Sequence, residues 1–244
     1  MDEVIEIRIR MHVKDYLTKQ MKKLDGKQDF SEIIVNPFFL ALMKNQLKID
    51  TKKKLAEHLI FQGVTKGLAT SFGCKLQKIA EEFTHEPPRK GFHLKICKNN
   101  KKYNVLVVSG LQHNTANVEK YRSKMEKIRK DYPRESPIFG ICYGNQNVLK
   151  QNTFGKMLRK GLEGEKIIIG REFWEFISGN KKCRNELLKI IKNEAEEFSK
   201  SRNNQSINKV LLTKSREMEK YLSKRYDEGN PKKFWENFFR DIYI

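Results

Sequence analysis

The sequence has little of what would place it in a membrane or in an oxidising compartment. No run of about 18 apolar residues occurs anywhere. The first residues, MDEVIEIRIRMHVKDYL, contain no apolar segment of signal-peptide length after a basic region. The 4 cysteines are widely spaced and include no CxxC pair, so we expect reduced thiols in the core. These absences predict a soluble, cytoplasmic protein with no membrane partner.

The sequence also lacks features that would mark a boundary between two domains. It has no Pro/Gly/Ser-rich linker, no low-complexity tract and no repeat of about 20 to 50 residues. A length of 244 residues suits one large domain or two small ones. Without a linker we expect a single domain over residues 1–244, with a helical part at 1–83, a core at 84–179 and a second helical part at 180–244.

Acidic residues are comparatively few. The 50 Lys and Arg outnumber the 30 Asp and Glu, which gives a formal net charge of +20. Solubility needs far less net charge than this, so the charge predicts a polyanionic partner, of which nucleic acid is the obvious kind. The alternative is a Lys-rich proteome or adaptation to heat, although heat adaptation usually adds Lys and Glu together.

Residues Gly91 to Asn117, GFHLKICKNNKKYNVLVVSGLQHNTAN, predict a β-hairpin followed by a helix. Phe92 to Cys97 and Tyr103 to Val108 are rich in apolar and β-branched residues, and the run between them has the composition of a turn. Asn114 or Thr115 can cap the helix that begins near Ala116. Further strands are expected at 137–143 and 166–169.

This layout resembles the core of the PD-(D/E)XK nucleases, and more narrowly the type II restriction endonucleases that cut GGNCC-type DNA sites. In that group the second strand runs into a lysine-Ser-Gly sequence with Asn-Thr-x-Asn soon after, which Ser109-Gly110 and Asn114-Thr115-Ala116-Asn117 match. The other resembling segments are Asn36-Pro37-Phe38, Thr70–Ala80, Phe139–Gly144 and Arg171–Gly179. The resemblance implies an α/β fold with a small central mixed sheet of the restriction-endonuclease-like type, wrapped by N- and C-terminal helices.

The three catalytic positions depart from the family pattern. On the register that the resemblance implies, the strand-leading aspartate falls at His93, the second acid at Leu106 and the lysine at Val108. Residues two apart on a strand share a face, so Leu106 and Val108 point where the family has its metal-binding acid and its lysine. Neither can bind the Mg²⁺ that the resemblance implies, with Mn²⁺ as an alternative, because such ions need oxygen ligands.

If cleavage survives, other residues must supply the catalytic and metal-binding groups, and His93 and Glu81 are the candidates. Nucleases of the resembling superfamily often carry a glutamate near the metals on the helix before the first core strand, as Glu81 is expected to lie. Glu86 is a further candidate, and Lys95 could serve as a charge partner in a centre built from these residues. In the alternative interpretation Glu81 is a solvated helix end, His93 merely ends a strand, and the centre is inactive.

DNA contacts are expected on the loop after the hairpin and on the basic helix that follows. Lysine and arginine on an exposed helix face can follow a phosphate backbone, and asparagine amides can pair with base edges. A solvated charged face is the alternative for any one of them. The candidates are Ser109, Asn114, Thr115, Asn117, Lys120, Arg122 and Lys124.

Helices account for most of the remaining chain. The first residues are ambiguous: Ile5, Ile9 and Val13 suit one helix face that continues to Leu24, whereas Ile5, Ile7, Ile9 and Met11 alternate as in a strand, and we favour the helix. Thr51 is expected to cap a helix that runs to Phe83 with a break near Gly63 or Gly67. Other helices are expected at 38–47, 171–177, 183–199, 206–225 and 231–243, with Trp174 and Trp235 as core anchors.

Three functions follow from these patterns. The resemblance predicts a type II restriction endonuclease that recognises and cleaves a GGNCC-like palindrome in duplex DNA. The first alternative is a catalytically inactive, sequence-specific DNA-binding relative, and the second is a structural or assembly partner without a DNA role. A palindromic site predicts a homodimer, for which the C-terminal helices could supply the interface through apolar positions such as Leu187, Ile190 and Ile191.

Overall fold

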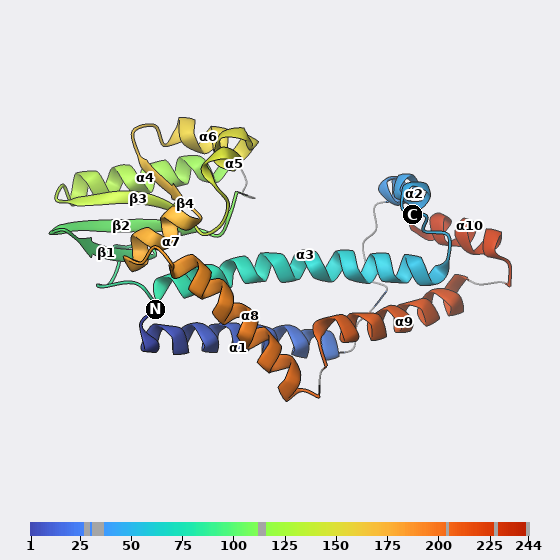
Figure 1. Ribbon diagram of the computed structural model, residues 1–244. Helices are drawn as coiled ribbons and strands as arrows, with labels where there is room; N and C mark the ends of the chain where they lie inside the picture. The colour runs from blue at the N-terminus through green and yellow to red at the C-terminus, as the bar shows by residue number, and fades with distance from the viewer. Residues whose placement is uncertain (27–29, 31–36, 112–115, 204, 227–228, 243–244) are drawn as a thin grey trace. The chain divides into compact units, whose positions relative to one another are not determined.

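The structure is a computed structural model that describes residues 1–26, 30, 37–111, 116–203, 205–226 and 229–242. The chain divides into two compact units, each built from two segments (Figure 1). Unit 1 comprises Met1–Tyr16 and Thr70–Glu197, and unit 2 comprises Leu17–Ala69 and Phe198–Ile244. The single domain expected from the sequence stays a prediction.

Helices make up most of both units, as expected. Unit 1 contains α4 (Ala116–Asp131), α5 (Gln146–Gln151), α6 (Thr153–Gly161) and α7 (Arg171–Ser178). Unit 2 contains α2 (Pro37–Gln46), α9 (Ile207–Tyr226) and α10 (Pro231–Ile242). The helices that contribute to both units are α1 (Glu3–Asp25), α3 (Lys52–Glu81) and α8 (Cys183–Ser201).

A four-stranded mixed sheet lies at the centre of unit 1. Its strands follow the order β1 (Leu94–Lys98), β2 (Lys101–Val108), β3 (Glu135–Ile141), β4 (Lys166–Ile169). β1 pairs antiparallel with β2, whereas β2, β3 and β4 are parallel. Asn99 and Asn100 make the hairpin turn with φ of 51° and 59°, the left-handed backbone that a two-residue turn needs. The expected hairpin and the α/β fold are therefore confirmed.

Helices cover both faces of this sheet. Figure 1 shows α4, α5 and α6 on one side of the strands and α7 on the other. On the α7 side, Phe173 lies so close to Gly140 that a Cβ there would be 2.6 Å from its ring. The α4 side has its own hydrophobic cluster, which includes Leu106, Val108, Val118, Met125, Ile128, Phe139, Ile141 and Leu158.

Unit 2 has a separate hydrophobic core, built from the second half of α1 with α2, α3, α9 and α10. Phe234 and Phe238 of α10 meet Tyr226 of α9 edge to face, with centroids 6.2 and 5.4 Å apart. Trp235 is half-buried beside this core, and Lys44 lies 4.0 Å from its ring centre. Trp174 of unit 1 is buried and donates from Nε1 to the carbonyl of Cys142 at 2.8 Å. Both tryptophans act as core anchors, as expected.

Three helical features differ from the sequence expectation. α3 runs without the break expected near Gly63 or Gly67, because its two ends are held in two cores and the glycine cost of about 1 kcal/mol each is small beside that packing. The strand alternative for the first residues is wrong, since α1 begins at Glu3. α5 and α6 were not anticipated, although Asn145 and Asn152 cap them. None of the helices in the described part of the chain is long and apolar enough to cross a membrane.

Candidate functional site

The face of β2 that carries Leu106 and Val108 is filled by hydrophobic core. Leu106 is 1% exposed and Val108 is 3% exposed. Both belong to the same cluster as Val118 and Met125 of α4 and Phe139 of β3. A carboxylate or ammonium at either position would lose its hydration without a partner of opposite charge. The apolar residues at 106 and 108 are therefore part of the packing between the sheet and α4.

His93 lies at the start of β1, half-buried beside β2. Its backbone N–H donates to the carbonyl of Val105 at 3.0 Å, and its Nδ1 accepts the N–H of Val107 at 2.9 Å. Burial lowers the pKa of His93; the negative charge of Glu81 opposes this, and Lys124 and Lys78 add to it. The ring is therefore neutral at pH 7 with its proton on Nε2. In this tautomer neither nitrogen offers a lone pair to a metal.

Glu81 ends α3 and is bound by a neighbouring lysine. Its Oε2 accepts from Lys78 Nζ at 2.7 Å, and its charge is close enough to act on the His93 imidazole. In the part of the chain that the structure describes, no group of three or more His, Cys, Asp or Glu could hold a metal ion. The donors around His93 thus do not fit Mg²⁺, which prefers near-octahedral oxygen coordination.

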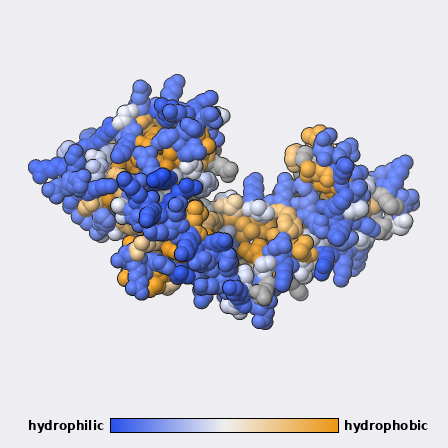
Figure 2. Space-filling view, viewed as in Figure 1, coloured by the Kyte–Doolittle hydropathy of each residue, from blue (hydrophilic) through white to orange (hydrophobic). Residues whose placement is uncertain are grey.

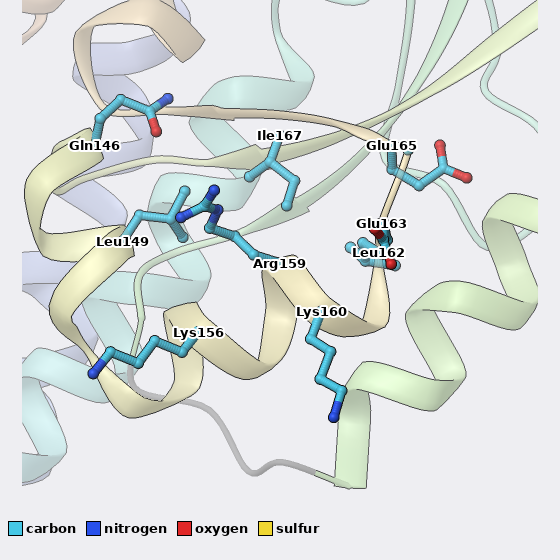
Figure 3. Close-up of a pocket in the computed structure, with 10 residues that line it drawn as sticks. Gln146, Leu149, Lys156, Arg159, Lys160, Leu162, Glu163, Glu165 and Ile167 are labelled. Atoms are coloured by element: carbon cyan, nitrogen blue, oxygen red, sulfur yellow. The ribbon is translucent and has the colours of Figure 1, made fainter.

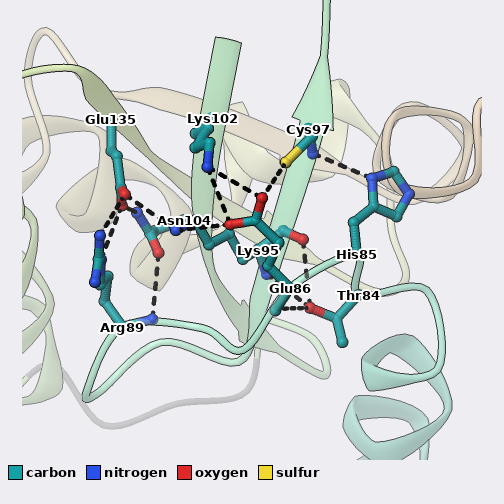
Figure 4. Close-up of polar contacts among 9 residues, drawn as sticks. All are labelled: Thr84, His85, Glu86, Arg89, Lys95, Cys97, Lys102, Asn104 and Glu135. Atoms are coloured by element: carbon teal, nitrogen blue, oxygen red, sulfur yellow. Dashed lines mark hydrogen bonds and ion pairs between the residues drawn. The ribbon is translucent and has the colours of Figure 1, made fainter. Parts of the chain in front are cut away.

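A cluster of charged residues lies where β2 and β3 begin (Figure 4). We call it the strand-end ion cluster. Glu135, at the start of β3, accepts from Arg89 at 2.7 and 3.2 Å and from Lys95 at 3.0 Å. Asn104 of β2 donates its side-chain amide to the same carboxylate. The remaining members are Glu86 and Lys102.

Lys95 links the two carboxylates of the strand-end ion cluster. Its Nζ lies 3.0 Å from Glu135 and 3.1 Å from Glu86. Hydrogen bonds from Arg89, then Asn104 and Lys95, lower the pKa of Glu135 to about 2, and bonds from Lys102, Lys95 and Cys97 lower that of Glu86 to about 2. Two acids surrounded by three cations have no negative charge left for a divalent metal. The cluster joins the segment before β1 to the first residues of β2 and β3.

The structure brings Lys95 and Glu86 together, whereas the centre considered from the sequence combined them with His93 and Glu81. Sequence reasoning missed Glu135 and Arg89, the partners of the buried Asn104. The available signal was a polar residue inside the apolar strand β2: Asn104 is 0% exposed, and a buried amide needs partners.

Ser109 and Gly110 are held against neighbouring elements where β2 ends. A Cβ on Gly73 of α3 would lie 2.8 Å from Ser109 Oγ, and a Cβ on Gly110 would clash with the Tyr143 ring. The Ser109 carbonyl accepts from the N–H of Tyr143 at 3.2 Å. Close packing therefore explains the Ser-Gly sequence. Asn114 and Thr115 lie outside the described residues, and their expected DNA contacts stay predictions.

α4 presents a basic surface on the side opposite the core. Asn117 is half-buried in its first turn, whereas Lys120, Arg122 and Lys124 are exposed. Arg122 pairs with Glu126 at 2.8 Å one turn later. Lys120 and Lys124 therefore have more freedom than Arg122 to meet a phosphate. Contact between these residues and DNA stays a prediction.

A pocket of about 620 Å³ opens beside α6. Leu149 and Ile167 are among its apolar lining residues, and α6 contributes Lys156, Arg159 and Lys160. In Figure 3, Arg159 reaches toward Leu149 and Ile167, while Lys156 and Lys160 extend to the outer side of α6. This helix packs directly on α4, so its cations extend the basic surface of unit 1.

Comparison with known proteins agrees with this fold. No curated protein matches the chain. The sequence model of one family, described as type II restriction endonuclease EcoO109I, matches residues 3–199. The match includes all four strands, α4 and the segment before β1. It covers most of the chain and confirms the resemblance to PD-(D/E)XK-type restriction endonucleases. The chain belongs to the EcoO109I family of type II restriction endonucleases.

Proposed function

We propose that this protein binds a GGNCC-type palindrome in duplex DNA as a homodimer and does not cleave it through the metal centre of its family. The burial of Leu106 and Val108 in the core beneath α4 carries this proposal. A restriction endonuclease of this fold needs oxygen ligands and a lysine on that face, and here the face is occupied by α4. The inactive, DNA-binding alternative from the sequence is thus the better supported one.

Restriction endonucleases generally use divalent metals, and Mg²⁺ or Mn²⁺ is the cofactor that the family implies. The donor set at His93, Leu106 and Val108 does not fit either ion. The strand-end ion cluster does not replace it, because its cations already neutralise both carboxylates. We therefore derive no step of hydrolysis through a metal.

The basic surface of α4 supports the DNA-binding part of the proposal. Lys120 and Lys124 project from one exposed helix face, and the net charge of +20 favours a polyanion. We propose that these residues, with Arg122 and Ser109, contact phosphates. We propose that Asn114, Thr115 and Asn117 contact base edges or the backbone, which would give the protein its site preference.

A second candidate function is cleavage by a rebuilt centre at His93 and Glu81. The observation in its favour is that the Glu81 charge acts on the His93 imidazole. A metal could bind His93 at Nδ1 only by displacing the Val107 N–H. It could bind at Nε2 only if the proton left that nitrogen, and a move of the proton to Nδ1 would also break the bond from Val107. If this centre exists, His93→Ala abolishes cutting and leaves DNA binding intact.

The proposal is tested by running two assays on the wild-type chain side by side. A gel shift compares a GGNCC duplex with a scrambled duplex of equal length. A supercoiled plasmid with GGNCC sites is incubated with Mg²⁺ or with Mn²⁺. We expect preferential retention of the GGNCC duplex and an intact plasmid. Site-specific cutting that is lost in His93→Ala would support the second candidate instead, and the absence of both binding and cutting would contradict each.

A further inference from the structure

α1 carries an apolar stripe that the core of unit 1 does not use. Val4, Ile7 and Met11 are 56%, 51% and 65% exposed, and their spacing places them on one side of the helix. The opposite side carries Ile9 and Val13, which are buried. Figure 2 shows hydrophobic side chains on the surface over the first turns of α1. Contiguous exposed apolar surface of this kind marks an interaction site.

Ion pairs hold this part of α1 in a fixed position within unit 1. Arg8 forms an ion pair with Glu82, just after α3, at 3.2 Å, and His12 makes a hydrogen bond with the same carboxylate at 2.7 Å. Arg10 lies 3.7 Å from Glu194 of α8, and the amino group of Met1 lies 2.9 Å from Glu186. The stripe is therefore preorganised, which lowers the entropic cost of docking.

The three α8 residues expected to supply the interface are largely covered in unit 1. Leu187 and Ile190 are 3% and 5% exposed and belong to the buried core, and Ile191 is half-buried. These three side chains therefore offer little apolar surface to a second copy.

From this stripe and the charges beside it, we propose that α1 docks antiparallel on α1 of a second copy of this chain. This inference rests on the homodimer of the proposed function. About a two-fold axis near Ile7, Val4 of each copy faces Met11 of the other, so the stripe is self-complementary. The charges are complementary in the same orientation. Exposed Asp2 and Glu3 lie at one end of the stripe and exposed Lys14 at the other, so the antiparallel pairing places acid against base.

The size of the stripe sets the expected strength of the dimer. A standard interface buries about 800 Å² per partner, and three side chains with their flanks supply only part of that. We therefore expect dimerisation to depend on protein concentration. Binding of a palindromic duplex strengthens it, because both half-sites engage only the dimer.

Sedimentation equilibrium of the full chain over a concentration series tests the docking. Ile7→Lys places two like charges near the two-fold axis, and we expect dimerisation to weaken at least about tenfold. Val148→Lys is the matched control, since Val148 of α5 is a comparably exposed apolar residue of unit 1. We expect it to dimerise like the wild type. Thermal melting verifies that both variants fold.

A charge swap tests the orientation. Glu3→Lys alone and Lys14→Glu alone each place like charges together, and we expect each to weaken the dimer. The double variant restores acid against base, and its affinity should return toward that of the wild type. A structural defect at either position would not be rescued in this way. A wild-type dimer with no loss in Ile7→Lys, or a double variant no stronger than the singles, overturns the α1 pairing.

These outcomes separate the inference from the proposed function. If the wild type dimerises and binds the GGNCC duplex but Ile7→Lys remains dimeric, the α1 pairing fails and the proposed function stands. If the wild type is monomeric with and without the duplex, the homodimer and the pairing fail together, and the gel shift decides DNA binding by itself.

Discussion

A histidine at the head of a strand can serve chemistry through either ring nitrogen, and His93 has one of them engaged by the backbone. Its Nδ1 accepts from Val107 at 2.9 Å, which leaves the proton on Nε2. The same bond satisfies a strand N–H that would otherwise be buried without an acceptor. At the residue scale, His93 therefore has a structural role in holding β2 beside the start of β1.

His93→Ala and His93→Asn separate this structural role from catalysis. Alanine leaves the Val107 N–H without its acceptor, and we expect the free energy of unfolding to fall by about 1 to 3 kcal/mol. The Oδ1 of asparagine lies at the same distance from the backbone as Nδ1, so we expect a much smaller loss. Urea unfolding at pH 7.5 measures both. Equal losses would contradict the role of the Nδ1 bond.

The free energy of unfolding should depend on pH through the hydrogen bond between His93 and Val107, because the pKa of His93 is lowered in the folded state. The folded state binds this proton less readily than the unfolded state, whose histidine has a pKa of about 6.5. The contribution of His93 to stability is therefore complete above about pH 6.5 and is lost as the pH falls below it. In His93→Asn this pH dependence should be absent.

A second prediction at the residue scale concerns the contribution of Glu135 to stability. Glu135→Gln leaves Lys95 and Arg89 without their shared counter-charge, and breaking a buried pair costs about 3 to 5 kcal/mol. The folded-state pKa is about 2, below the usual value near 4.5. The difference from wild type is thus complete above about pH 4.5 and shrinks as the pH falls toward 2. Unfolding in urea at pH 7, 5 and 3 measures it, and Glu135→Gln/Lys95→Met should recover part of the loss.

At the element scale, α4 has two faces with separate roles. Val118, Met125 and Ile128 pack on the sheet, and the cations face outward. Lys120→Ala or Lys124→Ala should weaken binding similarly on all sequences and reduce the salt slope of log K by about one unit. Arg122→Ala should change it less because Glu126 holds that side chain.

Fluorescence anisotropy on labelled duplexes over a salt series measures these slopes. Lys189→Ala is the control, since Lys189 is an exposed cation of α8 away from this helix. If the slope is unchanged in both Lys120→Ala and Lys124→Ala, the phosphate contacts lie elsewhere.

The elements themselves could largely be predicted from local sequence. Stretches rich in apolar and β-branched residues predicted β1, β2 and β4. Gly179, with φ of 70°, ends α7 as expected. The stretch from Gln146 to Gly161 was missed because two short helices joined at a capping asparagine show little periodicity. The ion cluster was missed because Glu135 and Asn104 meet only through strand pairing, which a linear pattern does not specify.

At the scale of the whole molecule, two hydrophobic cores are joined by helices that run through both units. We propose that the chain nevertheless behaves as the single domain expected from its sequence, because α1, α3 and α8 cannot unravel in one unit without disturbing the other.

Phe234→Ala tests this cooperativity. Phe234 is 1% exposed in the core of unit 2, and its truncation costs about 3 to 5 kcal/mol. In a single cooperative domain, hydrogen exchange should accelerate in β2 and β3 as well as in α9 and α10. Acceleration confined to the helices of unit 2 would show that the units unfold independently.

The central claim is that the face of β2 that carries Leu106 and Val108 is hydrophobic core, and the stability of Leu106→Glu tests it most directly. Introducing the family's acid at a residue 1% exposed buries a carboxylate without a partner. We predict a loss of at least about 3 kcal/mol in the free energy of unfolding, or failure to fold, whereas Leu106→Met loses less than about 1.5 kcal/mol. If Leu106→Glu unfolds within about 0.5 kcal/mol of the wild type, position 106 is open to water and the claim is wrong.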